Sequence, residues 1–145
     1  MMIAKIDAPK APLPTDEERS RPFWQGAREG KLRLQVCTAC GTPRYPDAPI
    51  CARCLSEESR WADFEPRGKV KAWCRFHRAY FEGLPLPHTV MLVELDAGVA
   101  LYANLATSAR DTVPYVGMEV QAEFEEIAHG VTMPKFRPLD SAMRT

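Results

Sequence analysis

Two Cys-x-x-Cys pairs constrain the fold of this chain more than any other feature of its sequence. Cys37 and Cys40 form the first pair, ten residues follow, and Cys51 and Cys54 form the second. Each short turn brings two thiolates to one side, so two turns supply four ligands for a tetrahedral metal ion. Gly41 relaxes the backbone where the first turn ends. The short loop between the pairs fits a compact zinc ribbon or rubredoxin-like hairpin.

Zinc is the metal that we expect at these four cysteines. Iron also accepts four thiolates, but zinc is the ordinary choice at a site without a redox role. Disulfide bonds are the alternative, and a fifth cysteine, Cys74, leaves an odd number in a chain for which we expect a reducing compartment. Four protein ligands leave no open coordination position, so the predicted ion is structural and does not activate water.

Composition indicates a globular protein with a small core and no membrane contact. The 145 residues are 46% hydrophobic and 26% charged, and a chain of this size benefits from a metal ion. Its longest apolar stretches are far shorter than the roughly 20 residues of a membrane span. The first 14 residues contain three prolines and lack the apolar core of a signal peptide. These features predict a soluble, cytoplasmic protein.

The charges balance overall but are unevenly distributed along the chain. Lysine plus arginine and aspartate plus glutamate each number 19, whereas a dedicated nucleic-acid binder usually has a basic excess. Residues 67–78 nevertheless carry five cations and no acid, and residues 119–126 carry four acids and no cation. We therefore expect one strand with a positive face and another with a negative face.

The N-terminal part, residues 1–30, is predicted to contain a flexible arm followed by helices. Its beginning shows no periodicity, which is typical of an arm. Thr15 and Glu18 then have the spacing of a capping box, which satisfies free amides at the start of a helix. Ser20 is a second candidate cap, because Pro22 would occupy the first turn, where its missing N–H costs nothing.

This second helix carries two bulky aromatic residues. Phe23, Trp24 and Ala27 form its apolar side, and Gly30 would end it. An element so short and so apolar on one side needs something to pack against. Two interpretations stay open at this point: Phe23 and Trp24 pack on the chain's own body, or they dock on a partner subunit.

From residue 31 onward the pattern is that of strands. Residues 31–36 alternate between apolar and polar side chains, which indicates a half-buried strand. Further strands are predicted at 61–64, 69–76, 88–95, 99–105, 118–125 and 131–136. Asp96, Ala97 and Gly98 separate two of them and favour a tight hairpin.

The predicted fold class is therefore mainly β. About five strands over roughly 70 residues suit a small closed barrel such as an OB-fold, which leaves no exposed sheet edge. The expected division is a zinc ribbon at 31–64, an OB-fold at 65–138 and a tail at 139–145.

No group of residues in the sequence suggests catalysis. Strand alternation places Cys74 on the core side of its strand, where a thiol is an inert small hydrophobe. His77, His88 and His129 have no carboxylate or second histidine at a useful spacing, so each is expected at a strand end or in a loop. A glycine-rich phosphate loop and a nucleophile elbow are both absent from the sequence. We name no catalytic residue.

A longer series of motifs extends through most of the chain. In order, they are Phe23-Trp24, Gly30-Lys31-Leu32, Cys37-x2-Cys40-Gly41, Tyr45-Pro46, Cys51-x2-Cys54, Trp61, Gly68-Lys69-Val70, His77, Leu95-Asp96-x-Gly98, Val116-Gly117-Met118 and Pro134-x-Phe136-x-Pro138. Each is common alone, but the ordered set over residues 20–138 resembles the DUF35 family, zinc-ribbon OB-fold proteins that accompany acyl-CoA enzymes. The resemblance implies an N-terminal helical hairpin, a rubredoxin-like zinc ribbon and a C-terminal OB-fold barrel.

The resemblance also implies a function. It implies the small subunit of a hetero-oligomer with a thiolase-like enzyme or a hotdog-fold enoyl-CoA hydratase, in which the large subunit holds the reacting residues. We therefore expect a non-catalytic, zinc-binding subunit that assists a thiolase-like partner and helps to enclose acyl-CoA. Cations for the CoA phosphates and an aromatic surface for the adenine are expected from Arg67, Lys69, Lys71, Trp73, Arg75 and Arg78. A solvated outer face is the alternative for this basic strand.

Two other functions stay open. OB-folds and zinc ribbons both occur in proteins that bind single-stranded nucleic acid, and basic residues interleaved with aromatic ones are typical of such proteins. The zero net charge and the acidic strand weaken this interpretation. A free-standing hydratase or thioesterase is the third possibility, and no constellation of residues supports it.

Overall fold

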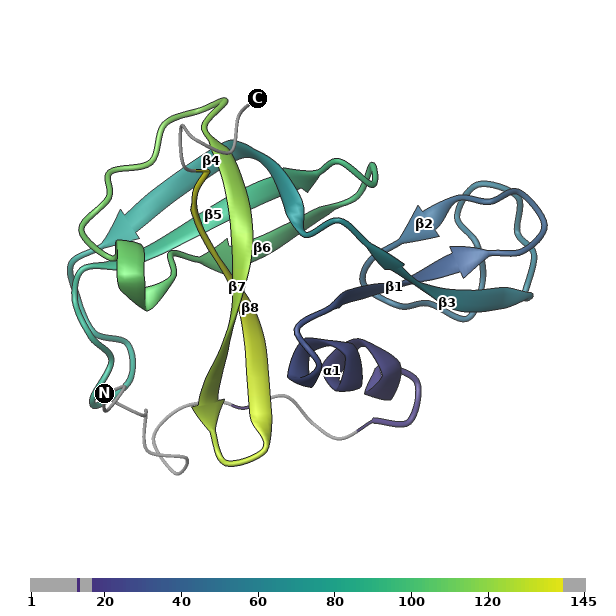
Figure 1. Ribbon diagram of the computed structural model, residues 1–145, viewed down its shortest axis with the longest axis horizontal. Helices are drawn as coiled ribbons and strands as arrows, with labels where there is room; N and C mark the ends of the chain where they lie inside the picture. The colour runs from purple at the N-terminus through teal and green to yellow at the C-terminus, as the bar shows by residue number, and fades with distance from the viewer. Residues whose placement is uncertain (1–12, 14–16, 140–145) are drawn as a thin grey trace.

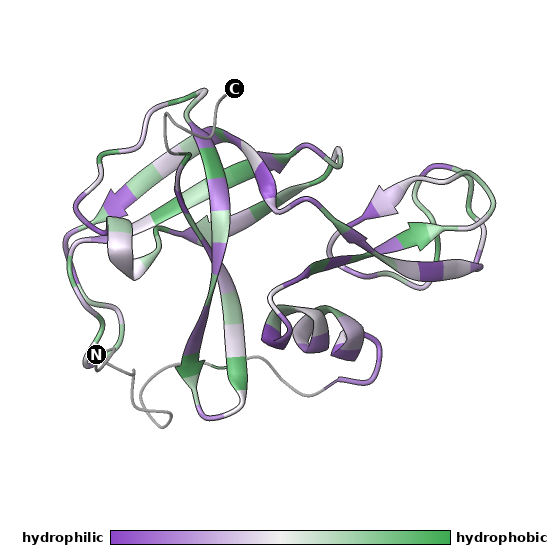
Figure 2. Cartoon of the chain, viewed as in Figure 1, coloured by the Kyte–Doolittle hydropathy of each residue, from purple (hydrophilic) through white to green (hydrophobic). Residues whose placement is uncertain are grey.

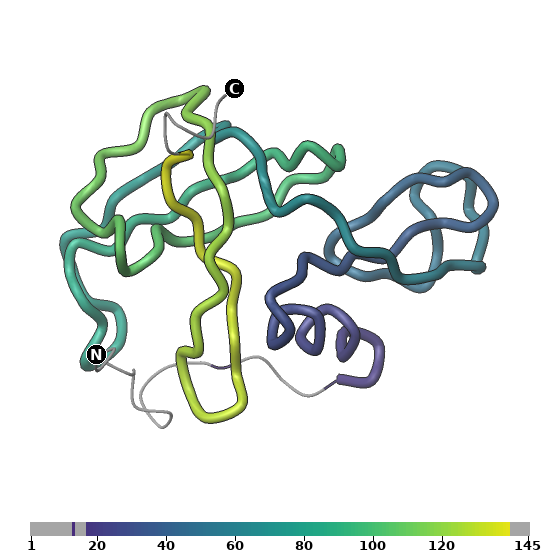
Figure 3. The backbone as a smooth tube through the Cα atoms, viewed as in Figure 1, coloured from purple at the N-terminus to yellow at the C-terminus, as the bar shows by residue number. Residues whose placement is uncertain are grey.

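The computed structural model describes residues 13 and 17–139, which form a mainly β fold in two parts (Figure 1). The helix α1 (Arg21–Arg28) precedes a three-stranded sheet of β1 (Leu32–Cys37), β2 (Pro43–Arg44) and β3 (Ser59–Phe64), in the order β2-β1-β3. The second sheet contains β4 (Arg67–Phe76), β5 (His88–Leu95), β6 (Ala100–Asn104), β7 (Glu119–Ala128) and β8 (Val131–Pro138), with the 3-10 helix η2 (Thr107–Ala109) between β6 and β7. The backbone trace shows the smaller sheet extending to one side of the larger one (Figure 3).

The second sheet closes into a barrel, as the strand pattern predicted. Its strands are in the order β6-β5-β4-β7-β8, and all the pairings in this series are antiparallel. The two outer strands meet where Leu105 forms a parallel bridge with Phe136. The Ala106 amide donates to the Phe136 carbonyl at 2.8 Å, which joins the edges and leaves Phe136 fully buried.

Alternating side chains build the core of the barrel. Figure 2 shows hydrophobic and hydrophilic residues alternating along these strands. Val70, Met91, Val93 and Val120 are at most 1% exposed and belong to one cluster that also includes residues of α1 and β1. The cluster therefore continues from the barrel to the helix and the smaller sheet.

The predicted tight hairpin is present between β5 and β6. Gly98 has φ +97°, a conformation that glycine adopts without strain, and its amide donates to the Leu95 carbonyl at 2.9 Å. The Leu95 amide in turn donates to the Val99 carbonyl at 2.8 Å. These bonds set the register of the two strands.

One helix, rather than a helical hairpin, is found among the described residues. Residues 18–20 form a turn, which the Ser20 amide closes by donating to the Glu17 carbonyl at 3.1 Å. Thr15, the expected start of a first helix, lies outside the described residues. Ser20 precedes α1, and Pro22 lies in its first turn as predicted, but the Ser20 hydroxyl donates to Glu17 instead of capping the helix. The hairpin implied by the resemblance is therefore wrong for the described residues, because the chain makes a single turn before α1.

The helix α1 ends in a tight turn that leads directly into β1. Gly30 has φ +74°, its amide donates to the Ala27 carbonyl at 3.0 Å, and the Lys31 amide donates to the Gly26 carbonyl at 2.8 Å. This is the Schellman pattern of a glycine-ended helix, as the sequence predicted. Gly26 packs so closely that a Cβ atom there would lie 2.7 Å from the Cβ of Arg33. The helix also contacts β7 and β8, so it lies between the two parts of the fold (Figure 1).

A β-bulge in β4 overturns the predicted position of Cys74. The pairing of β4 with β5 shifts by one residue between Val70 and Ala72. Because successive side chains of a strand alternate between faces, one extra residue exchanges the faces of the rest of β4. Cys74 is therefore exposed instead of facing the core. Arg75 takes the inner side, where its Nε donates to the Thr89 hydroxyl at 2.9 Å.

Candidate metal centre and binding surfaces

The four cysteines of the two pairs come together in the three-stranded part of the fold. Their Sγ atoms all lie within 4.8 Å of one another, with 3.5 Å between Cys37 and Cys54 and 3.7 Å between Cys40 and Cys51. A tetrahedral zinc ion with Zn–S bonds of about 2.3 Å places its sulfurs about 3.8 Å apart. The cluster therefore fits a structural zinc ion with little movement of its ligands.

The two cysteine turns have the same backbone geometry. The Gly41 amide donates to the Cys37 carbonyl at 2.8 Å, and the Leu55 amide donates to the Cys51 carbonyl at 2.9 Å. Gly41 has φ +76° and Leu55 has φ +65°. Such a conformation is uncommon for a leucine, and here it completes a turn that aims both cysteines of the pair at one point.

Hydrogen bonds favour the thiolate form of two of these cysteines. The Thr42 hydroxyl, 3.1 Å from the sulfur, and the Thr42 amide lower the pKa of Cys40 to about 6. Backbone amides of Cys54 and its neighbour lower the pKa of Cys51. The Ser56 amide has the same effect on Cys54, but the neighbouring cysteine sulfurs outweigh it and raise the pKa of Cys54 to about 12. Four negative sulfurs at this spacing therefore require a cation among them, and zinc fits that requirement.

The predicted ligand set leaves no position for a reacting group. Cys37 and Cys51 are 0% and 2% exposed, whereas Cys40 and Cys54 lie at the surface. With four protein ligands the ion would be coordinatively closed, so its contribution is to hold the ribbon together. Among the residues that the structure describes, these cysteines are the one group of His, Cys, Asp and Glu side chains with metal-binding geometry.

The predicted docking residues Phe23 and Trp24 occupy different environments. Phe23 is 7% exposed, belongs to the main core and has its ring centroid 5.3 Å from that of Tyr45. Trp24 meets Phe23 edge to face at 5.1 Å and is half-buried. Phe23 thus packs on the chain's own body. Docking on a partner stays a prediction, and only the partly exposed Trp24 has surface for it.

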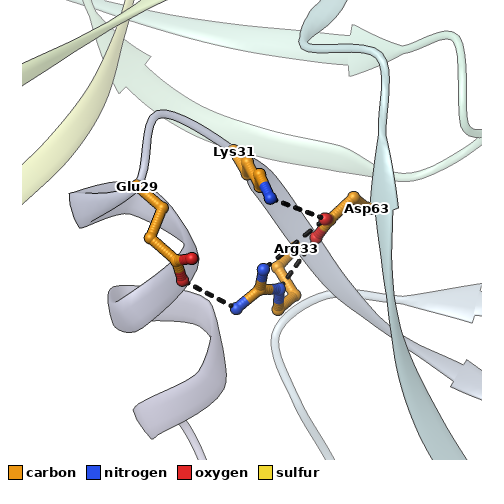
Figure 4. A network of polar contacts seen from close by, with 4 residues as sticks. All are labelled: Glu29, Lys31, Arg33 and Asp63. Carbon is orange, nitrogen blue, oxygen red and sulfur yellow. Dashed lines mark hydrogen bonds and ion pairs between the residues drawn. The ribbon is translucent and has the colours of Figure 1, made fainter.

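A polar network joins α1 to the three-stranded sheet (Figure 4). Arg33 donates from Nε to Asp63 at 2.8 Å and from Nη1 to Glu29 at 3.2 Å, and the Lys31 ammonium lies 4.0 Å from Asp63. The hydrogen bond from Arg33 lowers the pKa of Asp63. One guanidinium therefore links α1, β1 and β3 at a half-exposed position, which orients the helix on the ribbon.

The basic strand does not present its cations on one continuous face. Lys69 and Lys71 are exposed in the first half of β4, and the Lys71 ammonium lies 2.8 Å from Glu94. Hydrogen bonding to Glu94 raises the pKa of Lys71. Arg67 is partly buried, and its Nε has no hydrogen-bond partner. At this end of the strand, the charge of Lys71 is therefore already paired within the chain.

The rest of the predicted CoA-binding set lies beyond the bulge. Trp73 is 36% exposed, and the Arg75 guanidinium lies 5.9 Å from its ring centroid. Arg75 also donates to the Thr112 carbonyl at 2.6 Å, so it ties β4 to the loop before β7. Arg78 is exposed in the loop after β4. Contact of any of these residues with CoA stays a prediction.

The acidic strand β7 is largely neutralised by its neighbours. Glu123 forms an ion pair with Arg137 at 2.8 Å. Glu125, 8% exposed, accepts hydrogen bonds from the Thr107 amide at 2.7 Å and hydroxyl at 2.8 Å, and Lys135 lies 3.5 Å away. These carboxylates therefore hold η2 and β8 in place rather than forming a free negative face.

The histidines occupy strand ends and loops, as predicted. His88 begins β5, with Nε2 3.3 Å from the Asn104 side-chain nitrogen, and burial is the main cause of its lowered pKa. His77 and His129 are exposed outside the strands. None of the three lies in a described cluster that resembles a catalytic site.

One unusual residue was not identified from the sequence. All three guanidinium nitrogens of Arg44 are buried and lack a hydrogen-bond partner. The only signal in the sequence is an arginine directly before Tyr45 and Pro46, inside the ribbon between the cysteine pairs. Burial of that side chain depends on contacts distant in sequence, which the local pattern does not reveal.

Comparisons with known proteins support both parts of the fold. Residues 24–60 match the family described as "ChsH2, rubredoxin-like zinc ribbon domain", and residues 61–125 match "ChsH2, C-terminal OB-fold domain". A solved structure titled "Ltp2-ChsH2(DUF35) aldolase" shares 30% identity, with a TM-score of 0.77, over 87% of this chain and 98% of that chain. A DUF35 protein of unknown function from Sulfolobus solfataricus has a TM-score of 0.56 over 72% of this chain and 77% of its own, at 16% identity, which supports the fold alone.

A curated relative extends the comparison to a second kind of protein. It is named "Probable enoyl-CoA hydratase alpha subunit" and comes from Thermomonospora curvata. It is 33% identical over 132 residues, which is 90% of this chain. The chain spans 41% of the length of that relative.

Proposed function

We propose a function from one premise, that this chain belongs to the DUF35/ChsH2 family of zinc-ribbon OB-fold proteins. The proposed function is that of a non-catalytic, zinc-stabilised subunit of an acyl-CoA-processing complex, in which a thiolase-like partner forms or cleaves a carbon–carbon bond. The observation that carries the proposal is the likeness to the aldolase structure. It covers 98% of the matching chain, so ribbon and barrel both have counterparts there.

The non-catalytic role is supported by the chemistry of the described residues. The four-cysteine site is closed to substrate, and the three histidines lie at strand ends or in loops, where they form no metal-binding group with other described His, Cys, Asp or Glu side chains. The buried carboxylate of Glu125 is used to hold η2. We therefore assign the reacting groups to the partner. A reduced four-cysteine site suits a cytoplasmic location, which is part of the proposal.

We place the proposed CoA contact at the distal end of β4. Trp73 offers a partly exposed ring, and the loop after β4 carries Arg78 together with Tyr80 and Phe81, which are 65% and 40% exposed. A cation next to aromatic surface suits the phosphates and adenine of CoA. Lys71 at the proximal end is already paired with Glu94 and contributes less to this contact.

A second candidate partner is a hotdog-fold enoyl-CoA hydratase. The observation in its favour is the 33% identity to a relative whose name specifies a hydratase subunit. The two candidates differ in the reaction of the complex: addition of water to an enoyl-CoA, or making and breaking of a carbon–carbon bond. Assays of one purified complex for both reactions separate them.

The proposal is tested with the zinc-loaded chain alone and co-expressed with a thiolase-like subunit from the same host. We expect no turnover of acyl-CoA by the chain alone and carbon–carbon lyase or condensation activity in a stoichiometric complex. Trp73→Ala is expected to raise KM for the acyl-CoA about tenfold without changing the mass of the complex, which corresponds to about 1.4 kcal/mol. Tyr102→Ala is the matched control, because Tyr102 is 74% exposed on β6.

Either of two results would count against this function. Turnover by the isolated chain would show that it is an enzyme in its own right. Salt-sensitive binding of single-stranded oligonucleotides, with no complex formed, would support the nucleic-acid interpretation instead.

A further inference from the structure

A small pocket lies between α1 and the ribbon, and neither the four cysteines nor residues of β4 line it. Its volume is about 140 Å³. The walls are mainly aromatic and include Phe23, Trp24, Tyr45 and Trp61. The one cationic side chain among the residues that line it is Arg44. The pocket therefore combines an apolar wall with one cationic side chain, Arg44, and one acidic side chain, Asp47.

Arg44 enters this pocket without a partner for its charge. It is placed by β2, where it pairs with Gln35 of β1. Its Nε, Nη1 and Nη2 atoms are all buried, and none has a hydrogen-bond partner. Burying an unpaired charge is among the most unfavourable arrangements in a folded protein, because the interior does not replace the lost hydration. An acceptor from outside the described fold would remove this cost.

Gln35, a polar residue that lines the pocket beside Arg44, uses its side chain for other partners. The Gln35 side chain accepts from the Ala48 amide at 2.9 Å and donates to the Ser59 hydroxyl at 3.0 Å. Asp47 also lines the pocket, yet the Arg44 nitrogens form no hydrogen bond with it. The five N–H donors of the Arg44 guanidinium therefore have no acceptor among the residues that line the pocket.

We propose that this pocket is a binding site for one carboxylate group, held by Arg44. A planar guanidinium fork matches the two oxygens of a carboxylate through parallel hydrogen bonds. The aromatic walls exclude water and suit the hydrocarbon part that carries the carboxylate. The volume is well below the roughly 300–1,000 Å³ of pockets that enclose whole drug-sized ligands, so it suits a short acidic group rather than an entire cofactor.

Two sources can provide this chemistry, and the experiment separates them. One is a free short carboxylate. The other is an acidic side chain or chain terminus of the partner subunit, and only this source depends on the proposed function. The carboxylate site is inferred from Arg44 and its surroundings alone. The experiment can therefore refute this site without refuting the proposed function, and the reverse.

The first arm titrates the zinc-loaded full chain with sodium propionate, using propionamide and sodium chloride at equal ionic strength as controls. The readouts are the NMR resonance of the Arg44 Nε–H group and the fluorescence of the tryptophans. A free carboxylate gives saturable shifts that propionamide does not give. Arg44→Gln abolishes them, whereas Arg60→Gln, which removes an exposed charge from β3, preserves them.

The second arm measures the dissociation constant of the complex with the partner subunit. If the carboxylate belongs to the partner, Arg44→Gln weakens the complex at least tenfold, and Arg60→Gln leaves it within twofold. A third variant, Arg44→Met, keeps the test informative if the glutamine variant folds poorly. Removal of an unpaired buried charge is expected to raise the melting temperature of the free chain by several degrees, whereas a purely structural arginine would lower it.

Three results would overturn the proposal. One is the absence of an effect in both arms. Another is a melting temperature that falls in Arg44→Met. The last is a change of the Arg44 resonance in Asp47→Asn without added ligand, since it would show that Asp47 already neutralises the arginine within the chain.

Discussion

Removal of the metal is expected to unfold the ribbon while leaving the barrel folded. Among residues 35–64 the buried apolar side chains are Val36, Cys37 and Cys51. At about 1.5–3 kcal/mol for each fully buried side chain, they contribute roughly 5–9 kcal/mol together. A structural zinc ion contributes about 10–16 kcal/mol at neutral pH, which is more than the three side chains together. The ribbon beyond Leu34 is therefore stabilised chiefly by the ion.

Hydrogen exchange followed by mass spectrometry measures this effect along the chain. After chelation, amides in residues 35–64 are expected to exchange orders of magnitude faster, most of all between the two cysteine pairs. The amides of β4 to β8 should stay protected, because the barrel has its own core around Val93 and Phe136 and its own closing bridge.

Two cysteine variants provide a matched comparison. Cys51→Ser removes a buried ligand and is expected to reproduce the effect of chelation, whereas Cys74→Ser makes the same chemical change at an exposed position outside the cluster. Slow exchange across 35–64 after the metal has been stripped would refute the reasoning. Equal effects of the two variants would also contradict it.

Three further predictions concern the helix, the polar network and the free thiol. Gly26→Ala is expected to cost about 1–3 kcal/mol in urea denaturation, because its Cβ would lie 2.7 Å from that of Arg33; an unchanged midpoint would show that the helix shifts freely. The hydrogen bond from Arg33 is the main cause of the lowered pKa of Asp63, so this bond stabilises the folded chain at neutral pH. The stabilisation is lost as the pH falls through the lowered pKa, below about 3.9. Since the Asp63 side chain is 43% exposed, the effect is under about 1 kcal/mol, and Arg33→Gln should remove this part of the acid dependence measured by thermal melting. Cys74 is expected to be the first thiol that iodoacetamide modifies in the zinc-loaded chain; modification of a cluster cysteine before Cys74 would contradict the exposed position after the bulge.

The parts of the fold that depend on local pattern could be predicted from the sequence. The spacing of Cys37, Cys40, Cys51 and Cys54 identified the cluster because tetrahedral coordination by two short turns allows few alternatives. Strand periodicity gave the β elements and the barrel, and Gly98 marked the hairpin because few other residues adopt its φ without strain. These features are encoded within a few residues of one another.

The predictions that were wrong, and the buried arginine that was missed, depend on contacts between distant parts of the chain. The bulge in β4 forms where its pairing with β5 slips by one residue, and nothing in the alternation around Cys74 reveals that slip. Arg44 lines its pocket together with residues of α1, β1 and β3, so its surroundings depend on parts of the chain that are distant in sequence. Pairing of Lys71 with Glu94 likewise requires the fold, so a basic run in the sequence overstated the free positive charge.

The central claim is that this chain acts as the small subunit of an acyl-CoA enzyme. Affinity purification of the tagged chain from its native host, with mass spectrometry of the copurifying proteins, tests it most directly. We expect a thiolase-like acyl-CoA enzyme in stoichiometric amount, with carbon–carbon lyase or condensation activity that depends on this chain. Recovery of the chain alone, or with nucleic-acid proteins in a nuclease-sensitive manner, would contradict the account.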